Sequence, residues 1–228
     1  QTSSQNSSNW RGQPTVNGKN APKSVGRSLF SQGHRVIANL SYEINWNNNL
    51  RTQIGLFYSG TEGQPYSYTY RDGADLLNDD SRDNALIYVP ASQSEITLED
   101  PSNWSALNSF IENNDYLSER RGDYVEKNAT RGPWTDIVDL RFVQDLIVSK
   151  NKLQFTFDIF NFTNFINQDW GRRYFVGSFG FAQPLRTVTA GPDPVFRFQE
   201  GSDDPRITDF GFSGSRWRAQ IGIRYTFK

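Results

Sequence analysis

The chain lacks cysteine and methionine and contains a single histidine, His34. Without cysteine there is no disulfide framework, no thiol nucleophile and no thiolate metal site. The charges nearly cancel, with 24 Lys and Arg against 25 Asp and Glu, so the basic excess typical of nucleic-acid-binding proteins is missing and no nucleic-acid partner is expected. No serine nucleophile motif lies near His34, and no glycine-rich phosphate loop is present. We therefore assign no catalytic residue and do not expect an enzyme.

Long apolar runs are also missing. No segment approaches the ~20 consecutive apolar residues of a transmembrane helix. Outer-membrane barrels do not need such runs, because their strands alternate apolar and polar residues. The chain begins with Gln1, and no leader of charged, apolar and then small residues is seen. Together with the strand count below, this leads us to expect a piece of a longer exported protein.

The last stretch, residues 215–227, alternates without a break. Successive side chains of a β-strand point to opposite faces, so this stretch predicts a strand with one apolar and one polar face. The apolar residues, which we expect to face a membrane, are Trp217, Ile221, Ile223, Tyr225 and Phe227, together with Ala219. Aromatic residues at both ends of an apolar band are typical of strands that cross an outer membrane. An edge strand of a soluble β-sandwich is the alternative.

Four earlier segments alternate in the same way, at residues 34–46, 50–59, 134–148 and 152–162. The turns at 47–49 and 149–151 are short, whereas the intervals 60–132 and 164–213 are long and polar. If both turns lie at one end of the strands, both long intervals lie at the other. Outer-membrane barrels segregate short periplasmic turns and long extracellular loops in this way. Residues 1–32, rich in Gln, Ser, Asn, Gly and Pro, are expected to be a loop or mobile segment.

Five strands cannot close a barrel, because the smallest ones need about eight. The sequence therefore predicts an all-β fold in which residues 33–228 supply the C-terminal strands of a transmembrane antiparallel β-barrel with long extracellular loops. The charged residues opposite the apolar faces are expected to line the lumen. They are Arg35, Arg51, Arg141, Asp158, Arg216, Arg218 and Arg224. Such residues either guide a solute or form ion pairs that hold neighbouring strands together.

The long interval 60–132 contains local signals of its own. Its tyrosine-rich start, residues 64–70, fits a short strand or a contact surface. Residues from about Trp104 to Arg120 predict a helix, capped by Ser102 or Asn103, with apolar residues on one face.

Three segments resemble the end of Oar-like TonB-dependent receptors, which are large outer-membrane proteins of the Bacteroidetes type. They are residues 153–164 (LQFTFDIFNFTN), Asp169-Trp170-Gly171, and the terminal stretch 217–227. Residues 84–90 (NALIYVP) also resemble a family segment, in which Asp usually stands where this chain has Ala85. The resemblance covers the strands and about half of the long intervals.

The resemblance implies active uptake of an unknown nutrient, a small solute or a peptide, across the cell outer membrane. It implies a barrel of about 22 strands, an upstream plug that contacts the TonB complex, and an upstream carboxypeptidase-like β-sandwich domain. The expected partners are outer-membrane lipid, the TonB complex and the barrel insertion machinery, which usually recognises a terminal aromatic residue. Here Phe227 is followed by Lys228, which departs from that pattern. A structural or adhesive barrel that transports nothing is the alternative.

An acidic cluster is the only candidate cofactor site, for calcium. It consists of Asp72, Asp75, Asp79, Asp80 and Asp83. Calcium takes several oxygen ligands from flexible loops, and the family often carries a glycine-spaced Asp/Asn loop at this place. Here the spacing is irregular and the mid-loop glycine is missing, so a solvated acidic loop is the alternative.

Overall fold

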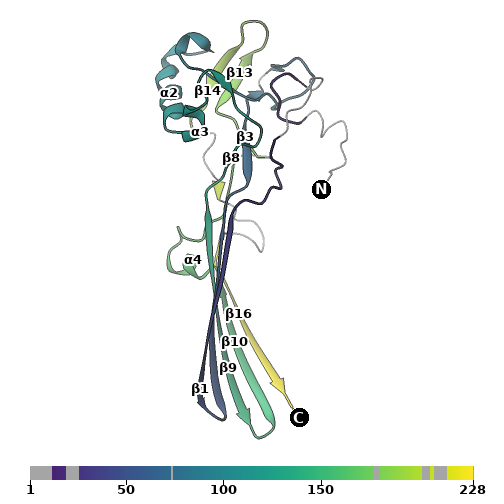
Figure 1. Ribbon diagram of the computed structural model, residues 1–228, viewed down its shortest axis with the longest axis vertical. Coiled ribbons are helices and arrows are strands. Elements are labelled where there is room, and N and C mark those ends of the chain that lie inside the picture. The colour runs from purple at the N-terminus through teal and green to yellow at the C-terminus, as the bar shows by residue number, and fades with distance from the viewer. Residues whose placement is uncertain are drawn as a thin grey trace. The chain divides into compact units, whose positions relative to one another are not determined.

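The computed structural model describes residues 12–18, 26–72, 74–176, 180–201, 206–207 and 215–227. The chain is mostly β and divides into two compact units (Figure 1). Unit 1 comprises Gln1–Ser31, Gln64–Gly132 and Val176–Arg206. Unit 2 comprises Gln32–Gly63, Pro133–Phe175 and Ile207–Lys228. Each unit is described by itself.

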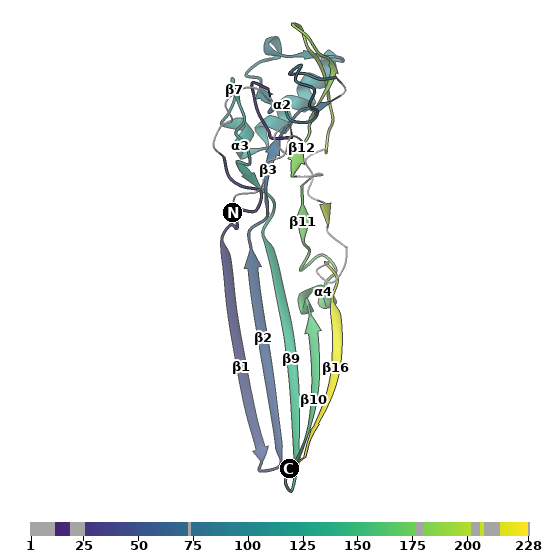
Figure 2. The same cartoon turned by 90° about the vertical axis from the view of Figure 1, so that its right-hand side faces the viewer.

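Unit 2 is built on a five-stranded sheet whose strands lie in the same order in the sheet as in the sequence, although the shorter strands that lie between them along the chain belong to other sheets (Figure 2). The strands are β1 (Arg35–Asn47), β2 (Leu50–Thr61), β9 (Thr135–Val148), β10 (Asn151–Phe160) and β16 (Arg218–Thr226). All neighbouring pairs are antiparallel. These strands overlap the five ranges that the alternation predicts. Among the described residues β1 and β16 are the edges of this sheet, and it does not close into a barrel.

Both tight turns of the sheet use residues that tolerate unusual backbone geometry. In the β1–β2 turn the Asn49 N–H donates to Asn47 Oδ1 at 2.8 Å, and in the β9–β10 turn Ser149 has a φ of 58°. After β10, Asn161 adopts a left-handed conformation with a φ of 56° and precedes α4 (Phe162–Ile166). Asn and Ser are suited to such positions because their side chains hydrogen-bond to nearby backbone. The short strand β11 (Tyr174–Phe175) follows.

Unit 1 contains short elements only. Its strands are β3 (Pro65–Tyr68), β4 (Arg71–Asp72), β5 (Tyr88–Val89), β6 (Thr97–Leu98), β7 (Asp123–Tyr124), β8 (Thr130–Arg131), β12 (Phe181–Ala182), β13 (Leu185–Thr189) and β14 (Val195–Phe198). A further short strand, β15 (Arg206–Ile207), has one residue in each unit. Its helices are the 3₁₀ helices η1 (Gln93–Glu95) and η2 (Pro101–Asn103), and α2 (Trp104–Glu112) and α3 (Asp115–Ser118). The sheets are β12-β3-β8, β4-β13-β14-β6 and β5-β7.

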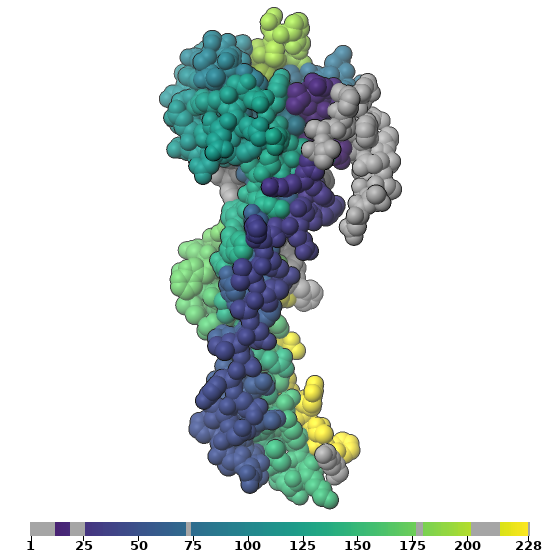
Figure 3. Space-filling model, viewed as in Figure 1, coloured from purple at the N-terminus to yellow at the C-terminus, as the bar shows by residue number. Residues whose placement is uncertain are grey.

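Residues from both long intervals share one hydrophobic core in unit 1. Tyr68 and Leu117 are almost fully buried, as is Leu185 from the second interval. Tyr70 stacks on Phe196 with ring centroids 4.7 Å apart, and burial raises the pKa of Tyr70 well above its ordinary value. Helix α2 and the β13–β14 hairpin lie side by side (Figure 3). The two intervals thus build a folded unit, which the alternation pattern alone does not reveal.

The predicted helix at 104–120 is two helices in the structure. Asn114 interrupts it with an extended backbone and caps α3, because its Oδ1 accepts the Leu117 N–H at 3.0 Å. The η2 helix precedes α2, and Asp100 caps η2 by accepting the Ser102 N–H at 2.9 Å. Asn103, one of the two expected caps, stands at the N-cap position of α2 but makes no capping hydrogen bond with its side chain.

The N-terminal segment expected as a loop lies largely outside the described residues, at 1–11 and 19–25. Of its described part, Thr15 is buried in unit 1. The Thr15 N–H donates to the Asn84 carbonyl oxygen at 2.8 Å, and the Leu86 N–H donates to the Thr15 carbonyl oxygen at 2.9 Å. Residues near Thr15 therefore extend the folded unit.

None of the helices in the described ranges is long and apolar enough to cross a membrane.

We expect Leu117→Ala to lower the free energy of unfolding of unit 1 by about 2–5 kcal/mol, because it leaves a cavity where a fully buried side chain stood. Hydrogen exchange of the Val125 amide, which donates to the Ile87 carbonyl oxygen inside this unit, measures the change. Leu29→Ala, at a side chain that is 38% exposed, is the matched control and should cost much less. Equal losses for the two variants would contradict the assignment of the core.

Candidate functional site

The apolar face of the five-stranded sheet is continuous, because the register places like residues side by side. Tyr42, Ile54, Phe142, Phe157 and Ile221 are successive cross-strand partners from β1 to β16. The next row toward the other end is Leu40, Leu56, Leu140, Ile159 and Ala219. Ile221 is 76% exposed and Tyr42 is 67% exposed. An exposed apolar surface that runs across five strands is far larger than a soluble monomer usually shows.

Thr52 and Gln144 are polar residues on this apolar face, and both are hydrogen-bonded within the sheet. The Trp46 Nε1–H donates to Thr52 Oγ1 at 2.8 Å, and the Thr52 hydroxyl donates to Gln144 Oε1 at 2.6 Å. The Gln144 Nε2 group donates in turn to the Arg51 carbonyl oxygen at 2.9 Å. The chain of donors and acceptors therefore satisfies these polar groups without water. Surfaces in contact with lipid require this, because an unsatisfied polar group there costs several kcal/mol.

The opposite end of the same face carries a second internal arrangement of aromatic and polar residues. Asp136 Oδ1 accepts the Tyr58 hydroxyl at 2.6 Å and the Trp134 Nε1–H at 2.8 Å. Trp46 and Tyr225 lie at the turn end of the face, in β1 and β16. Aromatic side chains with a polar group thus stand at both ends of the apolar band, as they do at membrane–water interfaces.

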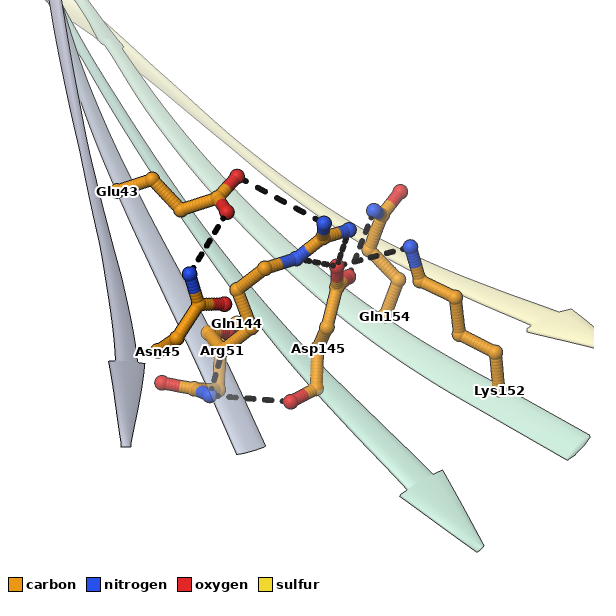
Figure 4. Close-up of polar contacts among 7 residues, drawn as sticks. All are labelled: Glu43, Asn45, Arg51, Gln144, Asp145, Lys152 and Gln154. Atoms are coloured by element: carbon orange, nitrogen blue, oxygen red, sulfur yellow. Dashed lines mark hydrogen bonds and ion pairs between the residues drawn. The ribbon is translucent and has the colours of Figure 1, made fainter. Parts of the chain in front are cut away.

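Asp145 is the centre of the polar face, and Figure 4 shows how side chains from neighbouring strands converge on it. Its side chain is almost fully buried. Arg51 donates to Asp145 Oδ2 at 3.0 Å through Nε and at 2.6 Å through Nη2. The Lys152 ammonium lies 2.8 Å from Oδ2, and Gln154 donates to Oδ1 at 2.8 Å. Glu43 is a second carboxylate for Arg51, at 3.7 Å. The cluster joins β1, β2, β9 and β10 through charge-assisted contacts.

The register places the expected charged residues of the five strands on the polar face. Arg141 lies 3.7 Å from Asp158 on the neighbouring strand. The Arg218 guanidinium lies over the Phe160 ring, 5.8 Å from its centroid. Arg35 belongs to β1, Arg224 is the cross-strand partner of Gln154, and Arg216 lies two residues before the start of β16. That these residues line a lumen stays a prediction.

A pocket of about 280 Å³ lies on this polar face. Its lining includes Asn39, Gly55, Asp139, Arg141 and Asp158. Gly55 is the cross-strand partner of Arg141, and the missing side chain leaves space between β1 and β9. The pocket therefore presents a cationic and an anionic group beside apolar side chains such as Phe57 and Phe160.

The acidic loop uses its carboxylates to hold its own backbone. Asp79 Oδ1 accepts the Ser81 N–H at 3.0 Å, and Asp75 Oδ2 accepts the Asp80 N–H at 2.8 Å. Asp83 Oδ1 accepts from Gln183 at 2.9 Å, across to the second long interval. Asp80 and Asp83 are left-handed, with φ values of 55° and 58°, a conformation that Asp and Asn tolerate better than most residues.

The expected calcium site therefore gains no support from this geometry. Of Asp72, the structure describes only its place in β4. No group of three acidic or histidine side chains within the described ranges is arranged to hold a metal ion. Calcium binding by these residues stays a prediction, and the loop geometry explains the Asp and Asn content without it.

The sequence did not reveal the contacts between polar side chains of β2 and β9. Thr52 and Gln144 were visible as isolated exceptions in two apolar alternations, but their contact depends on the register of β2 against β9. The two short turns fix the register of β1 against β2 and of β9 against β10, whereas β2 and β9 are joined by the long interval 62–134, so their register had to come from the structure. The register also places Arg51 opposite Asp145.

We expect Asp145→Ala to lower the free energy of unfolding of the sheet by about 3 kcal/mol, because it leaves Arg51, Lys152 and Gln154 without their common acceptor. Asp158→Ala is the matched control. It removes a longer contact to an arginine that is 61% exposed and should cost about 0–1 kcal/mol. Urea unfolding in detergent micelles, followed by tryptophan fluorescence, measures both. A larger loss in the control would refute the central role of Asp145.

No protein-family model, no curated protein and no solved structure matches this chain.

Proposed function

We propose that the five-stranded sheet is part of the wall of an outer-membrane β-barrel, with its apolar face toward lipid and its Asp145 face toward the lumen. The observation that carries the proposal is the apolar face itself. It is in register over five strands, and the polar residues Thr52, Gln144 and Asp136 on it are hydrogen-bonded within the sheet. Ile221 and Tyr42 on this face are 76% and 67% exposed.

The positions of the turns support the same proposal. The β1–β2 and β9–β10 connections are short, and both lie at the same end of an antiparallel meander. The strands continue from the opposite end into residues 62–134 and 161–217. Outer-membrane barrels keep their short turns on the periplasmic side and their long segments on the extracellular side. In this orientation β16 runs toward the periplasm.

We further propose active transport as the function of the protein that contains this sheet, driven by a TonB complex through an upstream plug. The proposal rests on the resemblance of residues 153–164 and 217–227 to Oar-like receptors. The pocket beside Gly55 and Arg141 offers polar groups to a solute that passes along the lumen. The nutrient itself stays unknown.

A structural or adhesive barrel is the second candidate, and the folded unit 1 favours it. Unit 1 has a core of its own, with Tyr68, Leu117 and Leu185 buried. A rigid folded unit suits the display of a binding surface. An upstream plug and TonB-contacting segment in the parent sequence would support transport, and their absence there would support display.

The orientation of the sheet is tested by a pair of arginine substitutions. Ile221→Arg places a charge in the middle of the apolar face and should cost about 2–4 kcal/mol if that face meets lipid near the midplane. Gln220→Arg, on the adjacent residue of the opposite face, is the control and should cost less than about 1 kcal/mol. Urea-induced unfolding of the parent protein in lipid vesicles gives both values. A larger cost at Gln220 would reverse the assignment of the two faces.

Membrane location is tested on the parent protein in the cell envelope. The outer-membrane fraction is run on a denaturing gel, boiled and unboiled. A closed barrel resists the detergent until it is boiled, so we expect a shift in mobility between the two samples. Recovery in the soluble fraction without a shift would mean that the apolar face packs against protein, as in a β-sandwich.

A further inference from the structure

Three arginines lie side by side on the four-stranded sheet of unit 1. Arg186 of β13 is the cross-strand partner of Arg197 of β14 on one side and of Arg71 of β4 on the other. Directly paired residues share a face of the sheet, and their Cβ atoms lie about 4.5–5.5 Å apart in an antiparallel pair such as β13–β14. We call Arg71, Arg186 and Arg197 the arginine row. Like charges directly opposite each other destabilise a sheet, so the row needs an explanation.

One carboxylate partly neutralises the row. Glu99 directly follows β6, which pairs with β14. Arg197 donates to Glu99 through Nε and through Nη2, the latter at 2.9 Å. This pairing holds the pKa of Glu99 below its ordinary value. Three arginines and one glutamate leave a net charge of +2, because 3 − 1 = 2. Arg186 is near enough for its charge to contribute to the lowered pKa of Glu99, although no ion pair or side-chain hydrogen bond joins it, or Arg71, to a described residue.

A pocket lies beside two members of the row, Arg186 and Arg197. It measures about 160 Å³ and is lined by Arg186, Thr187, Val188 and Arg197. A β-bulge falls at the same place, because the register of β13 against β14 shifts between Thr187 and Thr189. A bulge leaves its extra residue outside the ladder and bends the strand. The two arginines therefore flank a small hollow rather than a flat surface.

The core holds the row in place from the opposite face of the sheet. Thr187 and Phe196, which are cross-strand partners, are both buried, and Phe196 stacks on Tyr70. Leu185 is 1% exposed. Since β13 and β14 cannot slide without exposing these residues, the arginines cannot move apart by a change of register. The three positively charged residues are therefore held on one face of the sheet before any ligand arrives.

We propose that the arginine row is an anion-binding site for a phosphate or sulfate group carried by a larger ligand. Guanidinium groups present forked donors that match the oxygens of such anions in a bidentate manner. Arg186 and Arg197 contact the anion in the pocket, and Arg197 still has donors left after its pairing with Glu99. Arg71 adds attraction from the neighbouring strand. The site is independent of the membrane assignment, because all of its residues belong to unit 1.

The test is a titration of the full 228-residue chain, in detergent micelles, with inorganic phosphate and, separately, with inorganic sulfate at constant ionic strength. The Nε–H resonances of the arginines are followed by NMR and assigned from the single variants. We expect saturable shifts of Arg186 and Arg197 that give one dissociation constant. The stronger of the two anions identifies the group that the ligand carries. Shifts that grow linearly without saturation for both anions would overturn the proposal.

Four variants make the test specific. Arg186→Gln should weaken binding about fivefold or more, and Arg71→Gln should weaken it less. Glu99→Gln should strengthen binding several-fold, because it removes the carboxylate that competes for Arg197. Arg82→Gln, at an exposed arginine of the acidic loop, removes the same charge outside the row and should change the constant less than about twofold. Equal effects of Arg82→Gln and Arg186→Gln, or weaker binding by Glu99→Gln, would overturn the proposal.

Discussion

The antiparallel register of the five-stranded sheet is the constraint on which unit 2 depends. Because paired residues share a face, one alignment decides both faces at once. The alignment that places Phe142 beside Ile54 and Phe157 also places Asp145 beside Arg51 and Gln154. A slip of one residue on β10 would move Asp158 onto the apolar face and an apolar residue beside Asp145. An error in register would therefore disrupt both faces at once.

Much of unit 2 could be predicted from the sequence, whereas the fold of unit 1 could not. Strands of nine to fourteen residues carry several periods of alternation, so the pattern at 215–227 predicts β16. The strands of unit 1 contain two to five residues, which is too short for a period to emerge. Several of them also pair in parallel across long stretches of chain, as β4 does with β13. No local signal specifies such a partner, because it depends on the shared core.

The candidate sites follow the same division. Arg51, Arg141 and Asp158 were assigned to the polar face from the alternation. The pairing of Arg141 with Asp158 follows from the β9–β10 turn, whereas that of Arg51 with Asp145 depends on the register of β2 against β9. The arginine row was out of reach, since Arg71, Arg186 and Arg197 look like unrelated surface residues in the sequence. In the acidic loop, by contrast, the sequence suggested a site that the geometry does not support. Its composition drew attention to calcium, while Asp79 and Asp83 accept hydrogen bonds from the loop and from Gln183.

The discontinuity of unit 1 has a consequence for how such proteins diversify. Its sheet β4-β13-β14-β6 takes its two outer strands from the segment 64–132 and its central hairpin from the segment 176–206. Replacing either segment alone would leave the β13–β14 hairpin without its outer neighbours, or β4 and β6 without their partners. Recombination within a gene can therefore exchange this unit between relatives only when both segments, and the β9–β10 hairpin encoded between them, are inherited together. New surfaces on the unit are thus expected to arise by point substitution more readily than by shuffling.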